Sequence, residues 1–232
     1  MIAAYSGNRK VYPAIAASLC SLLEHNEAEK VYLVIEDNAF PYRLPECAEI
    51  VNVSEQEFFP KDGPNYACPW SYFALIRAAY PLMFPQHDRI LSLDCDTLIR
   101  ADISELWETD IEGQYFSASM ELGKSILAYP DIYTNVGVCL MNLKKLREDG
   151  TAEEIIRRLN ERRYKWPEQD VMNEVCRGSI LNMPAKYNSN PWTKVVPDAK
   201  IVHFAGVRVE EYVTLPEFQR HIPPFADEST GK

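Results

Sequence analysis

The sequence has no run of 18 apolar residues, which is about the length that a transmembrane helix needs. Its start, MIAAYSG, lacks the basic and long apolar segments of a signal peptide, so we expect it to form the first strand of the fold. Positive charge is scarce, because 24 lysines and arginines stand against 34 acidic residues and the net charge is −10. We therefore expect neither a nucleic-acid partner nor integral membrane contact.

None of the six cysteines stands in Cys-x-x-Cys spacing, and most lie inside apolar segments such as SLCSLL and GVCLMNL. This pattern favours free thiols in a reducing compartment over disulfides or a zinc site, so we expect a cytoplasmic protein. Internal repeats, low-complexity segments and linkers are also lacking. A chain of 232 residues can bury one sizeable core, and we expect a single domain over residues 1–232.

Two kinds of apolar pattern alternate through the first half of the chain. IAAYS, KVYLVI and DRILSL are short apolar runs, which predict strands buried on both faces of a sheet. YPAIAASLCSLLEH has helical spacing, and SYFALIRAAYPLMF predicts a helix that Pro81 ends or kinks. The alternation predicts an α/β fold with a central, mostly parallel sheet. We also expect strands in EIVNVS, YFSAS, VGVCLMN and AKIVHF, a helix in TAEEIIRRLNERRY, and a polar tail after the last strand.

The stretch LSLDCDTLI places Asp94 and Asp96 directly after a predicted central strand. Ligands of open α/β sheets bind at the carboxyl ends of the strands. Carboxylates this close repel each other and are costly to desolvate, and a divalent cation such as Mg²⁺ or Mn²⁺ is the usual remedy. The structural alternative is that Asp94 caps a turn and Asp96 is solvated, because Asp-x-Asp alone is a weak motif.

The surrounding motifs are more specific. An ordered set runs through nearly the whole chain: RILSLDCDTLIRADISELW, YTNVGVCLMNLKKLRE, WPEQDVMNEVCRG, MPAKYN and IVHFAG. In this order the set resembles glycosyltransferase family 8, retaining enzymes that include glycogenin and bacterial lipopolysaccharide galactosyl- and glucosyltransferases. The resemblance implies a single-domain, Rossmann-like nucleotide-diphospho-sugar transferase fold of the GT-A type. It also implies a UDP-hexose donor, with glucose or galactose as the hexose, and a glycan or other hydroxyl acceptor.

The resemblance assigns a metal role to three residues. Asp94, Asp96 and His203 would hold Mn²⁺, with Mg²⁺ as the second choice, against the diphosphate of the donor. His203 must be neutral to bind a cation. A lone histidine at a strand end is more often structural, and the two nearby aspartates are the reason to expect a ligand here.

The same resemblance assigns five residues to the donor sugar and its leaving group. Asn135 would bind sugar hydroxyls, and Gly137 would let the backbone approach closely. Glu168 replaces the first aspartate of the family's Asp-Gln-Asp block, and Gln169 would lie below the anomeric carbon. Because an amide is a poor nucleophile, the implied mechanism is front-face attack through a short-lived ion pair. Arg77 would contact the diphosphate or the sugar, whereas its structural alternative is a stem packed on its own helix.

Three departures from the family pattern concern the nucleotide and the acceptor. The loop after the first strand lacks the usual carboxylate, which leaves Asn8 as the expected contact to the uracil or ribose. In HFAGVRV, Gly206 is kept for donor binding, but Val209 stands where the family has a diphosphate-binding lysine, so Arg208 is the expected substitute. The acidic ending ADESTGK offers no membrane attachment, so we expect a soluble or partner-presented acceptor. Many relatives of this size pair, so a homodimer is an open expectation.

Two other functions remain open at this stage. A non-catalytic family member that binds nucleotide or glycan would explain the missing lysine and the altered first loop. DCDTL also resembles the Asp-x-Asp-x-Thr motif of haloacid-dehalogenase-type phosphotransferases. Against that interpretation, their motif lies near the N-terminus, and here the threonine follows the second aspartate directly.

Overall fold

The structure is a computed structural model that describes residues 1–122 and 132–226. Seven described strands form one sheet in the order β3-β2-β1-β4-β7-β6-β8. All of these except β7 run in the same direction, so the sheet is mostly parallel, as predicted. The strands are β1 (Ile2–Ser6), β2 (Lys30–Ile35), β3 (Ala48–Asn52), β4 (Arg89–Leu93), β6 (Phe116–Met120), β7 (Thr134–Asn142) and β8 (Ile180–Asn182).

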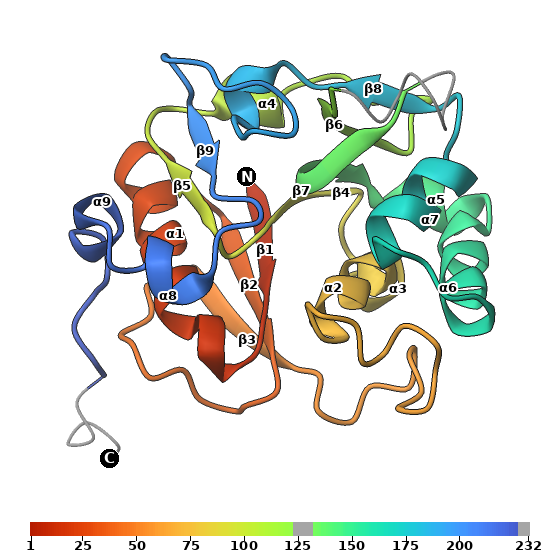
Figure 1. Cartoon of the computed structure of the whole chain (residues 1–232), viewed down its shortest axis with the longest axis horizontal. Coiled ribbons are helices and arrows are strands. Elements are labelled where there is room, and N and C mark those ends of the chain that lie inside the picture. Colours follow the sequence, from red (N-terminus) through yellow and green to blue (C-terminus); the bar gives the residue numbers. More distant parts are fainter. Residues whose placement is uncertain (123–131, 227–232) are drawn as a thin grey trace.

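Helices cover both faces of the sheet (Figure 1). On one face α1 (Tyr12–His25) packs against β1, β2 and β4. On the other face lie α2 (Phe73–Ile76), α3 (Tyr80–Met83), α5 (Leu143–Glu148), α6 (Thr151–Glu161) and α7 (Pro167–Val175). The central strands are apolar on both sides because both of their faces are buried, which is why their sequences read as continuous apolar runs.

Pro81 interrupts the helix predicted over residues 71–84, as expected. The segment forms α2, a 3₁₀ turn over Arg77–Ala79, and then α3. Pro81 has no N–H to offer the carbonyl of Arg77, and the N–H of Tyr80 donates to that carbonyl instead. Arg77 is the first residue of this tighter turn.

The polar tail expected after the last strand is partly helical. After β9 (Ile201–His203), the chain forms α8 (Val209–Tyr212) and α9 (Pro216–Gln219). Tyr212 and Phe218 are buried against α1, which explains why this segment is ordered despite its prolines. Residues 227–232, which hold most of the ADESTGK ending, lie outside the described residues. In the described part of the chain, no helix is both long and apolar enough to cross a bilayer.

Candidate metal and donor-sugar site

The Asp94–Asp96 turn lies at the carboxyl end of β4 and leads directly into β5 (Thr97–Ile99). The N–H of Asp94 donates to the Gly137 carbonyl at 2.8 Å, and the N–H of Thr97 donates to the Asp94 carbonyl at 3.2 Å. β5 pairs with β9 in antiparallel register, with Thr97 opposite His203. This pairing brings a histidine more than 100 residues away beside the two carboxylates.

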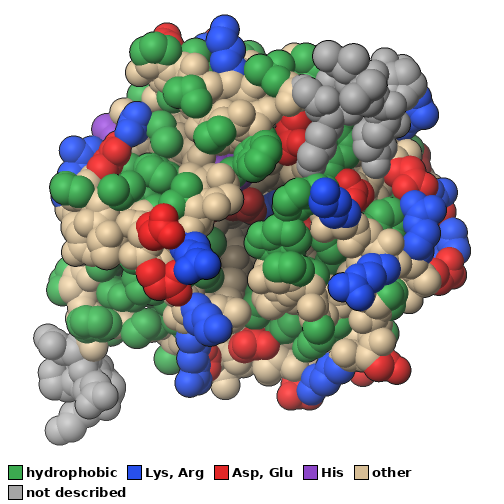
Figure 2. Space-filling view, in the orientation of Figure 1, with side chains coloured by type: hydrophobic (Ala, Val, Ile, Leu, Met, Phe, Trp, Pro, Cys, Tyr) green, Lys and Arg blue, Asp and Glu red, His purple; other side chains and the backbone are tan. Residues whose placement is uncertain are grey.

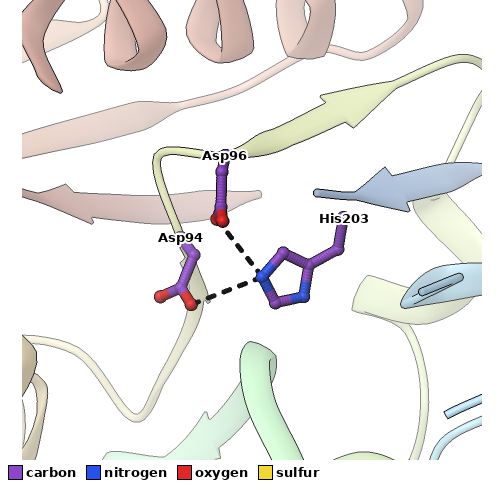
Figure 3. Close-up of side chains that lie close together, drawn as sticks. All are labelled: Asp94, Asp96 and His203. Atoms are coloured by element: carbon purple, nitrogen blue, oxygen red, sulfur yellow. Dashed lines mark ion pairs between the residues drawn. The ribbon is translucent and has the colours of Figure 1, made fainter. Parts of the chain in front are cut away.

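The three predicted metal ligands lie together (Figure 3). Nε2 of His203 is 3.2 Å from Oδ1 of Asp96 and 3.7 Å from Oδ2 of Asp94. One ligand atom from each of the three residues lies within 4.8 Å of the other two. Figure 2 shows a face of the molecule that is hollowed near its centre, with acidic side chains in the hollow and apolar side chains on its rims. Asp102 lies apart from the group and accepts the N–H of Ser104 at 2.7 Å.

This donor set fits a hard divalent cation. Two carboxylates and an imidazole are ligands that Mn²⁺ and Mg²⁺ accept in proteins, and the opposite charge would relieve the carboxylate repulsion. Burial of His203 disfavours its charged form, but the carboxylates of Asp96 and Asp94 outweigh burial and raise its pKa. Without a cation, the carboxylates therefore favour a proton on this ring. A bound cation would take the place of the proton at Nε2.

Gly137 makes room for this group. A Cβ at this position would lie 2.1 Å from Cε1 of His203 and 2.8 Å from Oδ2 of Asp94. The pairing of β6 and β7 shifts register at this point, where Ala118 faces Cys139 but Ser119 faces Asn135. Such a bulge turns the local backbone out of the regular ladder, and here it carries residues 135–137 toward the carboxylates.

Arg77 connects the metal group to the sugar side of the site. Its side chain is 96% buried and forms an ion pair with Asp94. Two further bonds hold it within the protein, because Nε donates to Oγ of Ser92 and Nη1 donates to the carbonyl of Val136, both at 2.7 Å. Nη1 also lies 3.9 Å from Oε1 of Glu168. Arg77 therefore holds two acidic residues in fixed relation to each other.

Glu168 and Gln169 lie in the first turn of α7, with the glutamate next to Arg77. Burial raises the pKa of the Glu168 carboxyl to about 7; Arg77 lowers it and Asp94 raises it further, with burial prevailing. The Gln169 amide is held from both ends. Its Nε2 donates to the Tyr133 hydroxyl at 3.0 Å, and its Oε1 accepts the N–H of Val136 at 3.4 Å.

A buried carboxylate that sequence reasoning did not identify completes the sugar side. Oε1 of Glu121 accepts from Nδ2 of Asn135 and from Nε2 of Gln169, each at 3.1 Å. Glu121 is 4% exposed and comes directly after β6. A signal for it is present in the sequence, because YFSASME places an acidic residue at a strand end in the same way as RILSLD does for Asp94.

The contacts that the structure describes for the remaining predicted residues lie outside this centre. Asn8 is half-buried and uses its side chain to cap a 3₁₀ turn, where it accepts the N–H of Lys10 at 3.1 Å. Gly206 lies in a turn with φ +80° beside Trp192. Arg208 is exposed and precedes α8, whereas Val209 packs against the apolar cluster around Tyr212. Roles for Asn8, Gly206 and Arg208 in donor binding remain predictions.

Comparison with known proteins identifies the family. The model of glycosyl transferase family 8 matches residues 4–208. The chain belongs to glycosyltransferase family 8. This membership confirms the resemblance inferred from the ordered motifs, and it leaves the phosphotransferase interpretation of DCDTL without support.

Relatives of this family 8 chain include bacterial glycosyltransferases. A lipopolysaccharide 1,2-glucosyltransferase of Escherichia coli (strain K12) is 33% identical over 134 residues, covering 52% of this chain and 39% of the relative. Glycosyltransferase GlyA of Streptococcus pneumoniae is 23% identical over 227 residues, covering 92% of this chain and 30% of the relative. The chain thus spans only about a third of the length of these curated relatives.

The fold is also that of a solved glycosyltransferase. The galactosyltransferase LgtC, in complex with donor and acceptor sugar analogues, superposes with a TM-score of 0.73 at 18% identity. The match covers 96% of this chain and 95% of LgtC. The family 8 chain therefore has the expected GT-A type α/β fold.

Proposed function

We propose that the chain transfers a hexose from a UDP-hexose to a hydroxyl group of a glycan or other acceptor, with retention of the anomeric configuration. The observation that carries this proposal is the group of Asp94, Asp96 and His203 at the carboxyl end of β4, with the buried Arg77 beside it. Family membership supports the transferase activity. The names of two similar proteins, a glucosyltransferase and a galactosyltransferase, support glucose or galactose as the transferred hexose.

Asp94, Asp96 and His203 would hold Mn²⁺, or Mg²⁺ in its place. When bound, such a cation acts as a Lewis acid that neutralises the charge of the leaving diphosphate. The protein's part is to fix the three ligand atoms within 4.8 Å of one another.

The donor hexose would lie between Arg77 and the buried carboxamides. Glu168 offers a carboxylate to its hydroxyls, and Arg77 keeps that carboxylate in place. Asn135 and Gln169 present fixed amides, because both of them donate to the same oxygen of Glu121. Fixed polar groups cost little reorganisation when charge develops in the transition state.

Retention is proposed to proceed by front-face attack. Gln169 is an amide whose oxygen already accepts a main-chain N–H, so it is poorly suited to form a covalent glycosyl intermediate. The buried carboxylate of Glu121 lies beside it and would stabilise positive charge on the sugar ring. The acceptor hydroxyl would then approach from the same side as the departing diphosphate.

A cytoplasmic site of action is proposed on the chemistry of the cysteines. All six are free thiols, and four of them are only half-buried. The proposed homodimer and the soluble acceptor have no further support from the described residues. Both remain predictions.

The test is a transfer assay on the purified protein with Mn²⁺, a panel of UDP-sugars and a panel of glycans. We expect sugar-dependent UDP release, and the anomeric configuration of the product, read by NMR, to match that of the donor. Asp96→Asn should abolish UDP release. Asp102 is a neighbouring carboxylate that caps a turn, so Asp102→Asn should leave UDP release unchanged. An inverted product would contradict the proposed retaining reaction. Metal-dependent UDP binding with neither transfer nor hydrolysis would favour the non-catalytic function.

A further inference from the structure

Asn188 lies at the end of the 3₁₀ turn Ala185–Tyr187, between β8 and β9, and is fully buried. Its carboxamide is placed between two residues with different proposed roles. One is Asn135 on the donor-sugar side, and the other is His203 on the metal side. The hydrogen bonds of this single amide bear on the tautomer of His203 and on the position of Asn135.

The orientation of the Asn188 amide follows from its contact with the main chain. The Asn135 carbonyl oxygen lies 3.2 Å from Nδ2 of Asn188, and a carbonyl oxygen can only accept a hydrogen bond. The atom facing it must therefore be the amide nitrogen. The same nitrogen also donates to Oδ1 of Asn135 at 3.0 Å, so both of its hydrogens are used.

With the nitrogen placed, the Asn188 oxygen must face the other way. Oδ1 of Asn188 lies 2.8 Å from Nδ1 of His203, and it also accepts from Nδ2 of Asn190 at 2.9 Å. An amide oxygen cannot donate, so Nδ1 of His203 has to carry the hydrogen of this contact. The opposite tautomer would place two lone pairs against each other at this distance.

A proton on Nδ1 leaves Nε2 as the free ligand atom of a neutral His203. Nε2 is the ring atom that faces Asp96 at 3.2 Å and Asp94 at 3.7 Å. The amide thus selects the tautomer in which the imidazole lone pair points at the two carboxylates, where a cation would lie.

We propose that Asn188 is a positioning residue that fixes His203 as a metal ligand through Nε2 and ties the metal group to the sugar-binding Asn135. This inference rests on the proposed function, because it assigns a purpose to contacts between two of its parts. Asn188 touches neither reactant in this account. It acts through His203 and Asn135, which its side chain contacts.

Two substitutions separate the acceptor role of the Asn188 amide from its donor role. Asn188→Ala removes both the acceptor for His203 and the donors for Asn135. Asn188→Asp keeps an acceptor for Nδ1 of His203 but loses both hydrogen bonds to Asn135. Loss of a hydrogen bond behind a metal ligand commonly weakens metal binding by about 10- to 100-fold.

The experiment measures Mn²⁺ binding to the full chain by electron paramagnetic resonance in the presence of UDP, followed by titrations with UDP and with UDP-hexose. We expect Asn188→Ala to bind Mn²⁺ at least about tenfold more weakly than wild type. Asn188→Asp should bind Mn²⁺ within about threefold of wild type, but should lose about fivefold or more of the extra affinity that the hexose adds to UDP.

The matched control is Asn65→Ala. Asn65 is also a buried amide that donates to two main-chain carbonyls, those of Leu159 and Arg162, but it lies outside the metal group. It should lower the thermal unfolding temperature without changing Mn²⁺ affinity. A purely structural role for Asn188 would give the same result at both positions.

Three outcomes would count against the inference in different ways. If wild type binds Mn²⁺ and Asn188→Ala binds it equally tightly, Asn188 does not position His203, and the proposed function stands. If wild type binds no Mn²⁺ even with UDP present, the proposed function fails and the inference fails with it. Loss of Mn²⁺ affinity in Asn188→Asp equal to that in Asn188→Ala would contradict the separation of the two halves of the amide.

Discussion

Gly137 and His203 approach so closely that no side chain fits between them. A Cβ on Gly137 would lie 2.1 Å from Cε1 and 2.8 Å from Nδ1 of the imidazole. The same backbone also accepts the N–H of Asp94, so one residue of β7 contacts two of the three proposed metal ligands. The glycine is required here by close packing, not by an unusual backbone angle.

Gly137→Ala should therefore disable the metal group. We expect Mn²⁺ affinity to fall by about 100-fold or more, because the added methyl group must displace His203 or Asp94. The measurement is Mn²⁺ titration with UDP present, with circular dichroism to check folding. Gly150→Ala is the control, because its Cβ would meet nothing within 4 Å and φ +66° predicts only a loss of stability. Unchanged affinity in Gly137→Ala would contradict the proposed ligand set.

Metal affinity should depend on pH through His203. The carboxylates of Asp96 and Asp94 overcome the effect of burial and raise its pKa, so at low pH a cation must displace a proton from Nε2. Below this raised pKa, Mn²⁺ affinity should increase with pH by up to about tenfold per pH unit, and above it the increase should stop. Titrations over a pH series test this. In His203→Asn the slope should flatten; an unchanged slope would assign the proton to another group.

Glu168 should make the protein less stable as pH rises. Burial raises its pKa to about 7, above the ordinary value of 4.5 for an unfolded glutamate. Between these values the folded state binds more protons than the unfolded state, so the free energy of unfolding falls with increasing pH.

Removing the Glu168 charge should therefore stabilise the metal-free protein at alkaline pH. In EDTA at about pH 8, Glu168→Gln should be more stable by on the order of 2 kcal/mol, and near pH 4 the difference should vanish. Thermal unfolding at both pH values measures this. Glu153→Gln, at an exposed position of α6, should change stability little at either pH. A destabilised Glu168→Gln at pH 8 would show that its ion pair with Arg77 outweighs burial.

Arg77 should be needed for folding stability as well as for function. Its buried guanidinium pairs with Asp94 and satisfies the Ser92 hydroxyl and the Val136 carbonyl. Arg77→Met leaves these groups without their donor, and we expect a loss of roughly 3 kcal/mol or more in urea unfolding. The control is Arg157→Met, at an exposed arginine that pairs with Glu154 at 2.8 Å. This substitution should lower the free energy of unfolding by less than about 1 kcal/mol. Similar losses at both positions would contradict this account.

The central strands were predictable because burial on both faces leaves a plain signal. KVYLVI and RILSL contain almost nothing but apolar residues, and both are strands in the structure. The strands that pattern reading missed, β5 and β8, have three residues each. Runs this short are too small to show a period, and their pairing depends on partners far away in the sequence.

The site was predicted in its separate parts but not in its connections. Asp94 and Asp96 stood out because two carboxylates follow a buried strand, and His203 was added through the family resemblance. Glu121 gave a similar signal at the end of β6 but had no second acidic residue to draw attention to it. The contact between Asn188 and His203 depends on the β5–β9 pairing and could not be read from the chain alone.

The central claim is that the crowded carboxylates exist to hold a cation against a nucleoside diphosphate. The most direct test is calorimetric titration of UDP into the purified protein with and without Mn²⁺, beside Asp96→Ala and the control Asp102→Ala. The account predicts tight UDP binding that requires both Mn²⁺ and Asp96 and that is unaffected at Asp102. UDP binding that is the same with or without Mn²⁺, or no binding in any condition, would contradict it.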